Sequence, residues 1–229
     1  YGNRVGIYRI LNALDRFDLK ASFAINGQLA ERAPYLLNRI AERGDEILGH
    51  GWNMDSLHYG GMDEDAEREL VRRTLDVLRA TSGQPVRGWL SPARNESERT
   101  PELLREHGID YFCDWVNDDM PYPFRTDNGP LTSLPLSTEL EDRFVVMNNL
   151  HSEQSWCEQL CDACDMLLAE AGTQGGRILA ISLHPWLIGQ PHRIGKLETA
   201  LEYITGQAGV WNAGAAEIVD CWRSQQDTT

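Results

Sequence analysis

Basic residues are scarce in this sequence, and long apolar runs are lacking. Its 229 residues include 21 lysines and arginines against 35 aspartates and glutamates, a formal net charge of -14. Nucleic acids and anionic membranes are bound through excess positive charge, so neither is an expected partner. No apolar run approaches the roughly 20 residues that a membrane-spanning helix needs, and Tyr1 to Ile10 do not resemble a signal peptide. We therefore expect a soluble, cytoplasmic protein.

Cysteine is also sparse, with five residues in the chain. An odd number excludes a complete disulfide framework, so we expect free thiols and a reducing compartment. Cys157, Cys161 and Cys164 have the C-x3-C-x2-C spacing of a cluster-binding loop. They fall within a helical pattern, however, and are better explained as small buried hydrophobic residues.

Short apolar runs alternate with helical periodicity along the whole chain, which is typical of repeated β/α units around a parallel sheet. Hydrophobic residues make up 41% of the sequence and charged residues 24%, which leaves no room for extended disorder. No linker or repeat divides the chain, so we predict a single domain over residues 1–229. The chain opens on a helix, so the first strand of such a fold is missing from the sequence.

The expected elements follow from this alternation and from Gly and Pro at their ends. We expect residues 120–128 to form an irregular connection. The pattern predicts helices at 5–17, 34–43, 63–80, 100–107, 153–170, 194–204 and 213–221, and strands at 21–25, 46–48, 86–90, 111–115, 131–134, 144–147 and 178–183.

Two histidines follow predicted strands. Active sites of β/α folds gather at the carboxyl ends of the strands, and imidazole is well matched to proton transfer near neutral pH. His184 follows the most apolar predicted strand, and His50 lies between two glycines after an earlier one. The alternatives are a core histidine for His184 and a turn-capping histidine for His50.

Other polar and aromatic residues lie at predicted strand ends. Asp118 and Asp119 are candidates for catalysis or substrate binding, but their position before Pro121 equally suits a turn. Asn26 is a further candidate for substrate contact. The tryptophans at strand ends could form the wall of an apolar or sugar-stacking cleft, or simply pack in the core. They are Trp52, Trp89, Trp115 and Trp186.

Four segments together resemble the polysaccharide deacetylase (NodB-homology, carbohydrate esterase 4) superfamily, in its allantoinase-like and peptidoglycan-deacetylase-like branch. They are Phe23 to Gly27, Ala41 to Asn53, Ile181 to Trp186 and Gly189 to Arg193. The resemblance implies an α/β fold, a distorted (β/α)7-type barrel that here lacks its first strand. It also implies an aspartate base on that strand, two metal-binding histidines spaced i, i+4, and a late histidine that acts as acid.

In that resemblance His50 matches the first metal histidine and His184 the late acid, but other positions depart from the pattern. Met54 occupies the second metal position, and a thioether is a poor ligand for zinc. His58 does not fit the spacing, and the expected arginine is replaced by Leu90 or Ser91. The cofactor is therefore left open, with a divalent metal such as zinc disfavoured by Met54.

The resulting hypothesis is a hydrolase that cleaves a non-peptide C–N bond in a cyclic amide, a ureide or an N-acetylated sugar. His50 and His184 would flank the scissile amide, His184 would protonate the leaving nitrogen, and Asp118 or Asp119 would orient substrate or water. The alternatives are a metal-dependent sugar or peptidoglycan N-deacetylase and a catalytically inactive barrel that serves as a binding module. We expect a homo-oligomer, since the resemblance and an exposed barrel edge both favour one.

Overall fold

The computed structural model describes residues 1–226, and their contacts group into two compact units. The helical unit comprises residues 1–19 and 136–212. The sheet unit comprises residues 20–135 and the segment that begins at Ala213. The single domain expected from the sequence stays a prediction.

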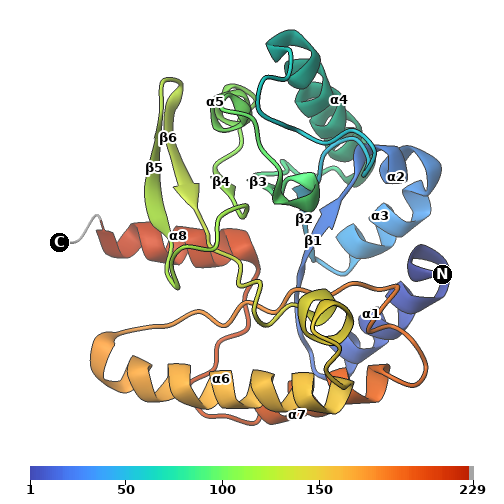
Figure 1. Ribbon diagram of the computed structural model, residues 1–229, viewed down its shortest axis with the longest axis vertical. Coiled ribbons are helices and arrows are strands. Elements are labelled where there is room, and N and C mark those ends of the chain that lie inside the picture. Colours follow the sequence, from blue (N-terminus) through green and yellow to red (C-terminus); the bar gives the residue numbers. More distant parts are fainter. Residues whose placement is uncertain (227–229) are drawn as a thin grey trace. The chain divides into compact units, whose positions relative to one another are not determined.

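The sheet unit is built on six strands in the order β1-β2-β3-β4-β6-β5. Neighbours from β1 to β6 run parallel, and β5 pairs antiparallel with β6 in the hairpin visible in Figure 1. Since the parallel strands share one direction, their carboxyl ends lie along one edge of the sheet. The strands are β1 (Ser22–Ile25), β2 (Glu46–Gly49), β3 (Gly88–Trp89), β4 (Tyr111–Phe112), β5 (Tyr122–Thr126) and β6 (Gly129–Ser133).

Helices of the sheet unit bury their apolar stripes against the strands and one another. The longest begins after Asp63, whose carboxylate accepts a hydrogen bond from the Ala66 amide at 2.9 Å, and it ends at Gly83 in the left-handed conformation. Its residues Leu75 and Leu78 are fully buried, as is Ile47 of β2. The helices are α2 (Gly27–Arg32), α3 (Pro34–Glu42), α4 (Glu64–Ser82), α5 (Thr100–Glu106) and α8 (Ala215–Gln226).

The helical unit contains three α-helices and two π-helical turns in its described residues. Ser152 caps the longest helix by accepting the Ser155 amide at 3.1 Å, and Leu160 and Leu197 are buried between that helix and its neighbour along the chain. No helix within residues 1–226 is both long and apolar enough to cross a membrane. The elements are η1 (Gly2–Gly6), α1 (Ile7–Arg16), η3 (Arg143–Asn148), α6 (Glu153–Gln174) and α7 (Ile194–Thr205).

The α/β class and most predicted elements are confirmed. The structure also confirms that Cys157, Cys161 and Cys164 lie on a helix, α6, as free thiols, and that Cys113 and Cys221 are free as well.

Four local predictions are wrong. Residues 144–147 lie within a π-helical turn, not a strand, and residues 120–128 include β5 rather than an irregular loop. The short helix α2 was missed. Residues 178–183 form no strand and are only half-buried, because an apolar run becomes a strand only when another strand pairs with it.

Candidate functional site

The loops that follow β1 and β2 are hydrogen bonded to each other at the carboxyl edge of the sheet. The Asn26 side chain donates to the backbone carbonyl of His50. The backbone amides of Gly27 and Gln28 donate to the carbonyls of Gly51 and Trp52, at 3.0 and 2.9 Å. Asn26, predicted to contact substrate, therefore holds the His50 backbone in place, and its role toward substrate stays a prediction.

The His50 imidazole is held in one orientation by the neighbouring strand. Its Nδ1 lies 2.6 Å from the carbonyl oxygen of Leu90. A carbonyl only accepts hydrogen bonds, so Nδ1 carries the proton and the neutral ring has its lone pair on Nε2. Gly51 has φ of +62°, and a Cβ there would lie 2.4 Å from Pro92 Cγ, so the turn after His50 requires glycine.

Two tryptophans predicted to bind substrate lie in the core. Trp89 has no exposed surface, and its Nε1 donates to Ser91 Oγ at 2.9 Å. Trp52 is 7% exposed, with the Arg73 guanidinium carbon 3.5 Å from its ring centroid. The enclosed ring of Trp89 fits the core alternative, and Trp52 is covered by Arg73. Substrate contact by either tryptophan stays a prediction.

A buried polar network fastens the segment after His50 to α4 and α5. His58 and Glu67 are both fully buried, with His58 Nδ1 2.8 Å from Glu67 Oε1. Ser97 and Thr100 also donate to the Glu67 carboxylate. Burial by itself raises the pKa of Glu67, but the hydrogen bonds from His58, Ser97 and Thr100 outweigh it, and its pKa lies below the usual value. Glu67 is therefore a charged anchor of these loops.

Asp118 and Asp119 lie on an exposed loop that precedes β5. Asp118 accepts the Met120 amide at 2.9 Å, which is the turn alternative foreseen from the sequence. A catalytic or substrate-orienting role for either carboxylate stays a prediction.

The helical unit contains a histidine–carboxylate pair. His184 Nδ1 lies 2.7 Å from Asp142 Oδ1, and the His184 backbone amide donates to Asp142 Oδ2 at 2.9 Å. The Asp142 side chain is fully buried, whereas that of His184 is 29% exposed. On the other side of the ring, Nε2 lies 3.9 Å from Glu141 Oε1. The Trp186 ring packs edge-on against the imidazole, with the two ring centroids 5.7 Å apart.

This pair fixes the orientation of the imidazole. A buried carboxylate that accepts from Nδ1 fixes the orientation of the ring and leaves Nε2 as the ring nitrogen on the other side. Sequence reasoning found His184 and missed Asp142. Asp142 precedes a stretch predicted to be a strand, and no pattern in the sequence pairs it with a residue 42 positions away.

The residues present do not fit the divalent metal that the family resemblance implies. Met54 at the expected second ligand position is 50% exposed and offers only a thioether. His58, the next histidine along the chain, is engaged by Glu67. Across residues 1–226, no three His, Cys, Asp or Glu side chains converge in a metal-binding arrangement.

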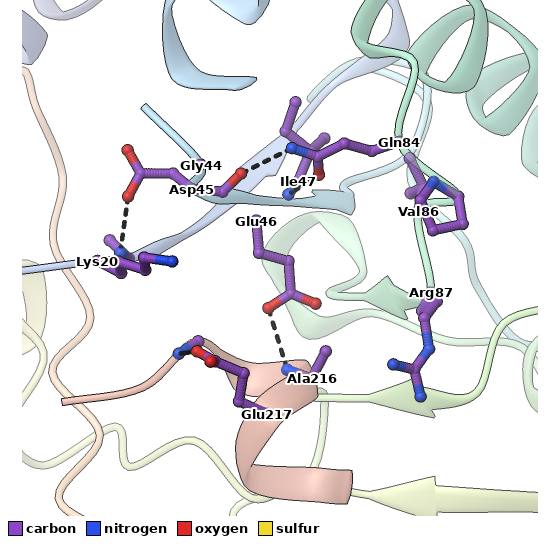
Figure 2. A pocket seen from close by; sticks show the side chains of 13 residues that line it. Lys20, Gly44, Asp45, Glu46, Ile47, Gln84, Val86, Arg87, Ala216 and Glu217 are labelled. Atoms are coloured by element: carbon purple, nitrogen blue, oxygen red, sulfur yellow. Dashed lines mark hydrogen bonds between the residues drawn. The ribbon is translucent and has the colours of Figure 1, made fainter. Parts of the chain in front are cut away.

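A separate cavity of about 240 Å³ lies at the amino ends of β1, β2 and β3. This edge of the sheet is opposite to the loops that follow β1 and β2. Figure 2 shows that the polar groups of the cavity bond to one another. Asp45 accepts the Ala21 amide at 3.0 Å, and Glu46 accepts the Ala216 amide at 3.1 Å. Arg43, outside the cavity lining, also donates to Asp45 at 2.7 Å. These carboxylates are thus already satisfied, and active sites of such sheets lie at the other edge.

Known proteins resemble this chain over nearly its full length. The family model described as Polysaccharide deacetylase matches residues 2–112. A putative polysaccharide deacetylase of Schizosaccharomyces pombe is 25% identical over 98% of this chain and 75% of its own. The crystal structure of Puue allantoinase is 31% identical, with a TM-score of 0.89, over 98% of this chain and 74% of that one. A probable polysaccharide deacetylase from Pseudomonas aeruginosa PAO1 is 29% identical, with a TM-score of 0.87, over 98% and 75%.

The fold and these similarities define a class of hydrolases that have an α/β fold and act on C–N bonds other than peptide bonds. The chain belongs to the polysaccharide deacetylase family. The family resemblance drawn from the sequence motifs is confirmed.

Proposed function

We propose that this protein hydrolyses an amide bond in a small cyclic ureide, with His184 as the general acid. The observation that supports this role most directly is the hydrogen bond between His184 Nδ1 and the buried Asp142 carboxylate, which leaves Nε2 to deliver the proton. The choice of a ureide rests on the similarity to Puue allantoinase. Water adds to the carbonyl carbon, the C–N bond breaks, and the leaving nitrogen takes the proton from His184.

His50 is assigned the complementary role of proton acceptor. Its Nδ1–H is committed to the Leu90 carbonyl, so the lone pair of the neutral ring is on Nε2. An imidazole in that tautomer accepts a proton from water as the water attacks. The assignment needs no metal-activated water, which agrees with the poor fit of the donor set at Met54.

The test compares turnover of allantoin by the full chain and its variants. His184→Ala should lose about 10²- to 10⁴-fold in kcat, the usual contribution of general acid catalysis, and Asp142→Asn should lose part of this. His151→Ala removes an exposed imidazole of the same unit and should keep full turnover. Circular dichroism and thermal melts check folding. If His184→Ala retains a third of the wild-type rate, the assignment is wrong.

A double variant tests whether both histidines serve one reaction. Groups that act as a unit are not additive, so the double His50→Ala, His184→Ala variant should lose little more than the worse single variant. Losses that multiply would show that the two side chains contribute independently, and a His50→Ala variant with the wild-type rate would remove His50 from the mechanism.

A second candidate is N-deacetylation of a sugar, favoured by the Schizosaccharomyces pombe relative and by a Helicobacter pylori peptidoglycan deacetylase that is 24% identical over 62% of this chain. The same variants are assayed on N-acetylglucosamine oligomers, with release of acetate as the readout. Acetate release without allantoin turnover would replace the first substrate class by the second and leave the role of His184 intact.

A further inference from the structure

The backbone of His184 is hydrogen bonded on both sides. Its amide donates to Asp142 Oδ2 at 2.9 Å, and its carbonyl oxygen accepts the amides of Leu187 and Ile188 at 2.9 and 3.0 Å. Residues 184–189, here called the histidine turn, therefore form a compact unit. The imidazole moves with this turn as a whole.

The helix formed by η1 and α1 lies directly against the histidine turn. The two segments join at Gly6, which has φ of -60° and ψ of -41°, an ordinary helical conformation that any residue adopts. A Cβ at Gly6 would lie 2.9 Å from the carbonyl carbon of Pro185 and closer still to its oxygen. Glycine is therefore required at this position by lack of space and not by backbone conformation.

The far end of the histidine turn contacts the same helix. A Cβ at Gly189 would lie 2.6 Å from Gly6 Cα and 2.7 Å from the Gly6 carbonyl oxygen. One helical turn further on, Arg9 donates from Nη1 to the Gly189 carbonyl oxygen at 2.9 Å. Because two glycines face each other, the two backbones meet with no side chain between them. Neither can shift toward the other without overlap of backbone atoms.

A third glycine extends this contact to the aromatic neighbour of His184. A Cβ at Gly2 would lie 3.1 Å from both the Cβ and the backbone nitrogen of Trp186. The Trp186 ring in turn packs edge-on against the His184 imidazole. Gly2 and Gly6 are four residues apart and share one face of the helix. Glycine lowers helix propensity, and the close contact with the histidine turn is what these two glycines allow.

We propose that Gly6 and Gly189, together with Arg9, are positioning residues that set the place of His184 through backbone contact between the first helix and the histidine turn. A methyl group at Gly6 displaces the turn, and His184 moves with it, away from the Asp142 carboxylate. The consequence for catalysis rests on the proposed function. The contact between His184 and Asp142 can be measured without any substrate.

The first test is the ring ¹⁵N spectrum of His184 in the full chain labelled with ¹⁵N-histidine, assigned by its loss in His184→Gln. In wild type the signals should show a proton held on Nδ1, since Asp142 accepts from that nitrogen. Gly6→Ala should shift them toward the pattern of a ring that exchanges between tautomers. Unaltered His184 signals in a folded Gly6→Ala variant would overturn the proposal.

The matched control is Gly195→Ala in the first turn of α7. A Cβ at Gly195 meets nothing within 4 Å, so a methyl group there enters open space in the same unit. The His184 signals of this variant should equal those of wild type. An equal shift in Gly6→Ala and Gly195→Ala would show that the effect does not come from the contact at Gly6, and would overturn the proposal.

A second variant serves if Gly6→Ala does not fold, which circular dichroism and thermal melts detect. Arg9→Met removes the donor to the Gly189 carbonyl without placing an atom between the two backbones. It should shift the His184 ring signals in the direction of tautomer exchange. In that case, ring signals identical to those of wild type would overturn the proposal.

A kinetic measurement separates positioning from a general loss of folded protein. On whichever substrate is turned over, Gly6→Ala should lower kcat about 10- to 100-fold, because a small misplacement of a catalytic group is costly. KM should stay within about twofold of wild type. A wild-type kcat per folded molecule would overturn the proposal. If wild type turns over neither substrate, the proposed function fails, while the ring signals still decide whether Gly6 positions His184.

Discussion

The sheet unit and the helical unit hold their candidate catalytic histidines in different ways. His50 follows a paired strand, and a backbone carbonyl of the next strand end orients its ring. His184 follows a segment that forms no strand, and a buried side chain, Asp142, orients it. A regular sheet positions a residue through its backbone, whereas an irregular segment needs a dedicated side-chain partner. The two regions should therefore respond differently to loss of a single polar group.

The largest stability effect is expected at Glu67 in the sheet unit. Glu67→Ala leaves His58 buried without its carboxylate and should cost about 3–5 kcal/mol, measured by urea unfolding. The matched control Glu69→Ala removes an exposed ion pair to Arg72 on the same helix and should cost less than about 1 kcal/mol. Equal costs for the two variants would show that the network does not anchor the loops.

The same residue predicts a pH dependence. The folded pKa of Glu67 lies below its unfolded value, so its stabilisation is present in full above the unfolded pKa of about 4.3 and is lost as pH falls through the folded pKa. The difference in unfolding free energy between wild type and Glu67→Gln should shrink as the pH falls below about 4.3. A difference that stays constant would contradict a charged Glu67.

An intermediate effect is expected from the helix caps, one in each unit. Asp63→Ala at α4 and Ser152→Ala at α6 each remove a side-chain acceptor from the first turn and should cost about 1 kcal/mol. Asp63→Asn and Ser152→Thr, which keep an acceptor, should restore most of it. A cap acts on its own helix. A large difference between the stability costs of the two substitutions would therefore mean that one unit tolerates the loss of a cap better than the other.

The smallest effect is expected in a measurement of hydrogen exchange on the unmodified protein. β2 pairs with β1 along its whole length and with β3 at Gly49, whereas residues 178–183 belong to no strand. Mass spectrometry should show faster exchange in 178–183 than in 46–49, because unpaired amides exchange without local unfolding. Equal protection of both segments would remove the proposed distinction between the two units.

Sequence reasoning succeeded where local signals and structure agree. Short apolar runs followed closely by glycine predicted β1 and β2, and helical periodicity with an acidic start predicted α4. It failed at η3 and at residues 178–183, since the pattern Val145-Val146 and the apolar run before His184 satisfy strand preferences without strand partners. Strand propensity describes which backbone conformation a segment can adopt, whereas strand pairing depends on residues that are distant in the sequence.

By itself the sequence determined the charge, the alternation of helices and strands, and the positions of His50 and His184 after apolar runs. Only the tertiary structure decided that Asp142 is the partner of His184 and that Trp89 is enclosed. Periodicity is local along the chain, whereas burial and hydrogen bonding depend on residues brought together by folding.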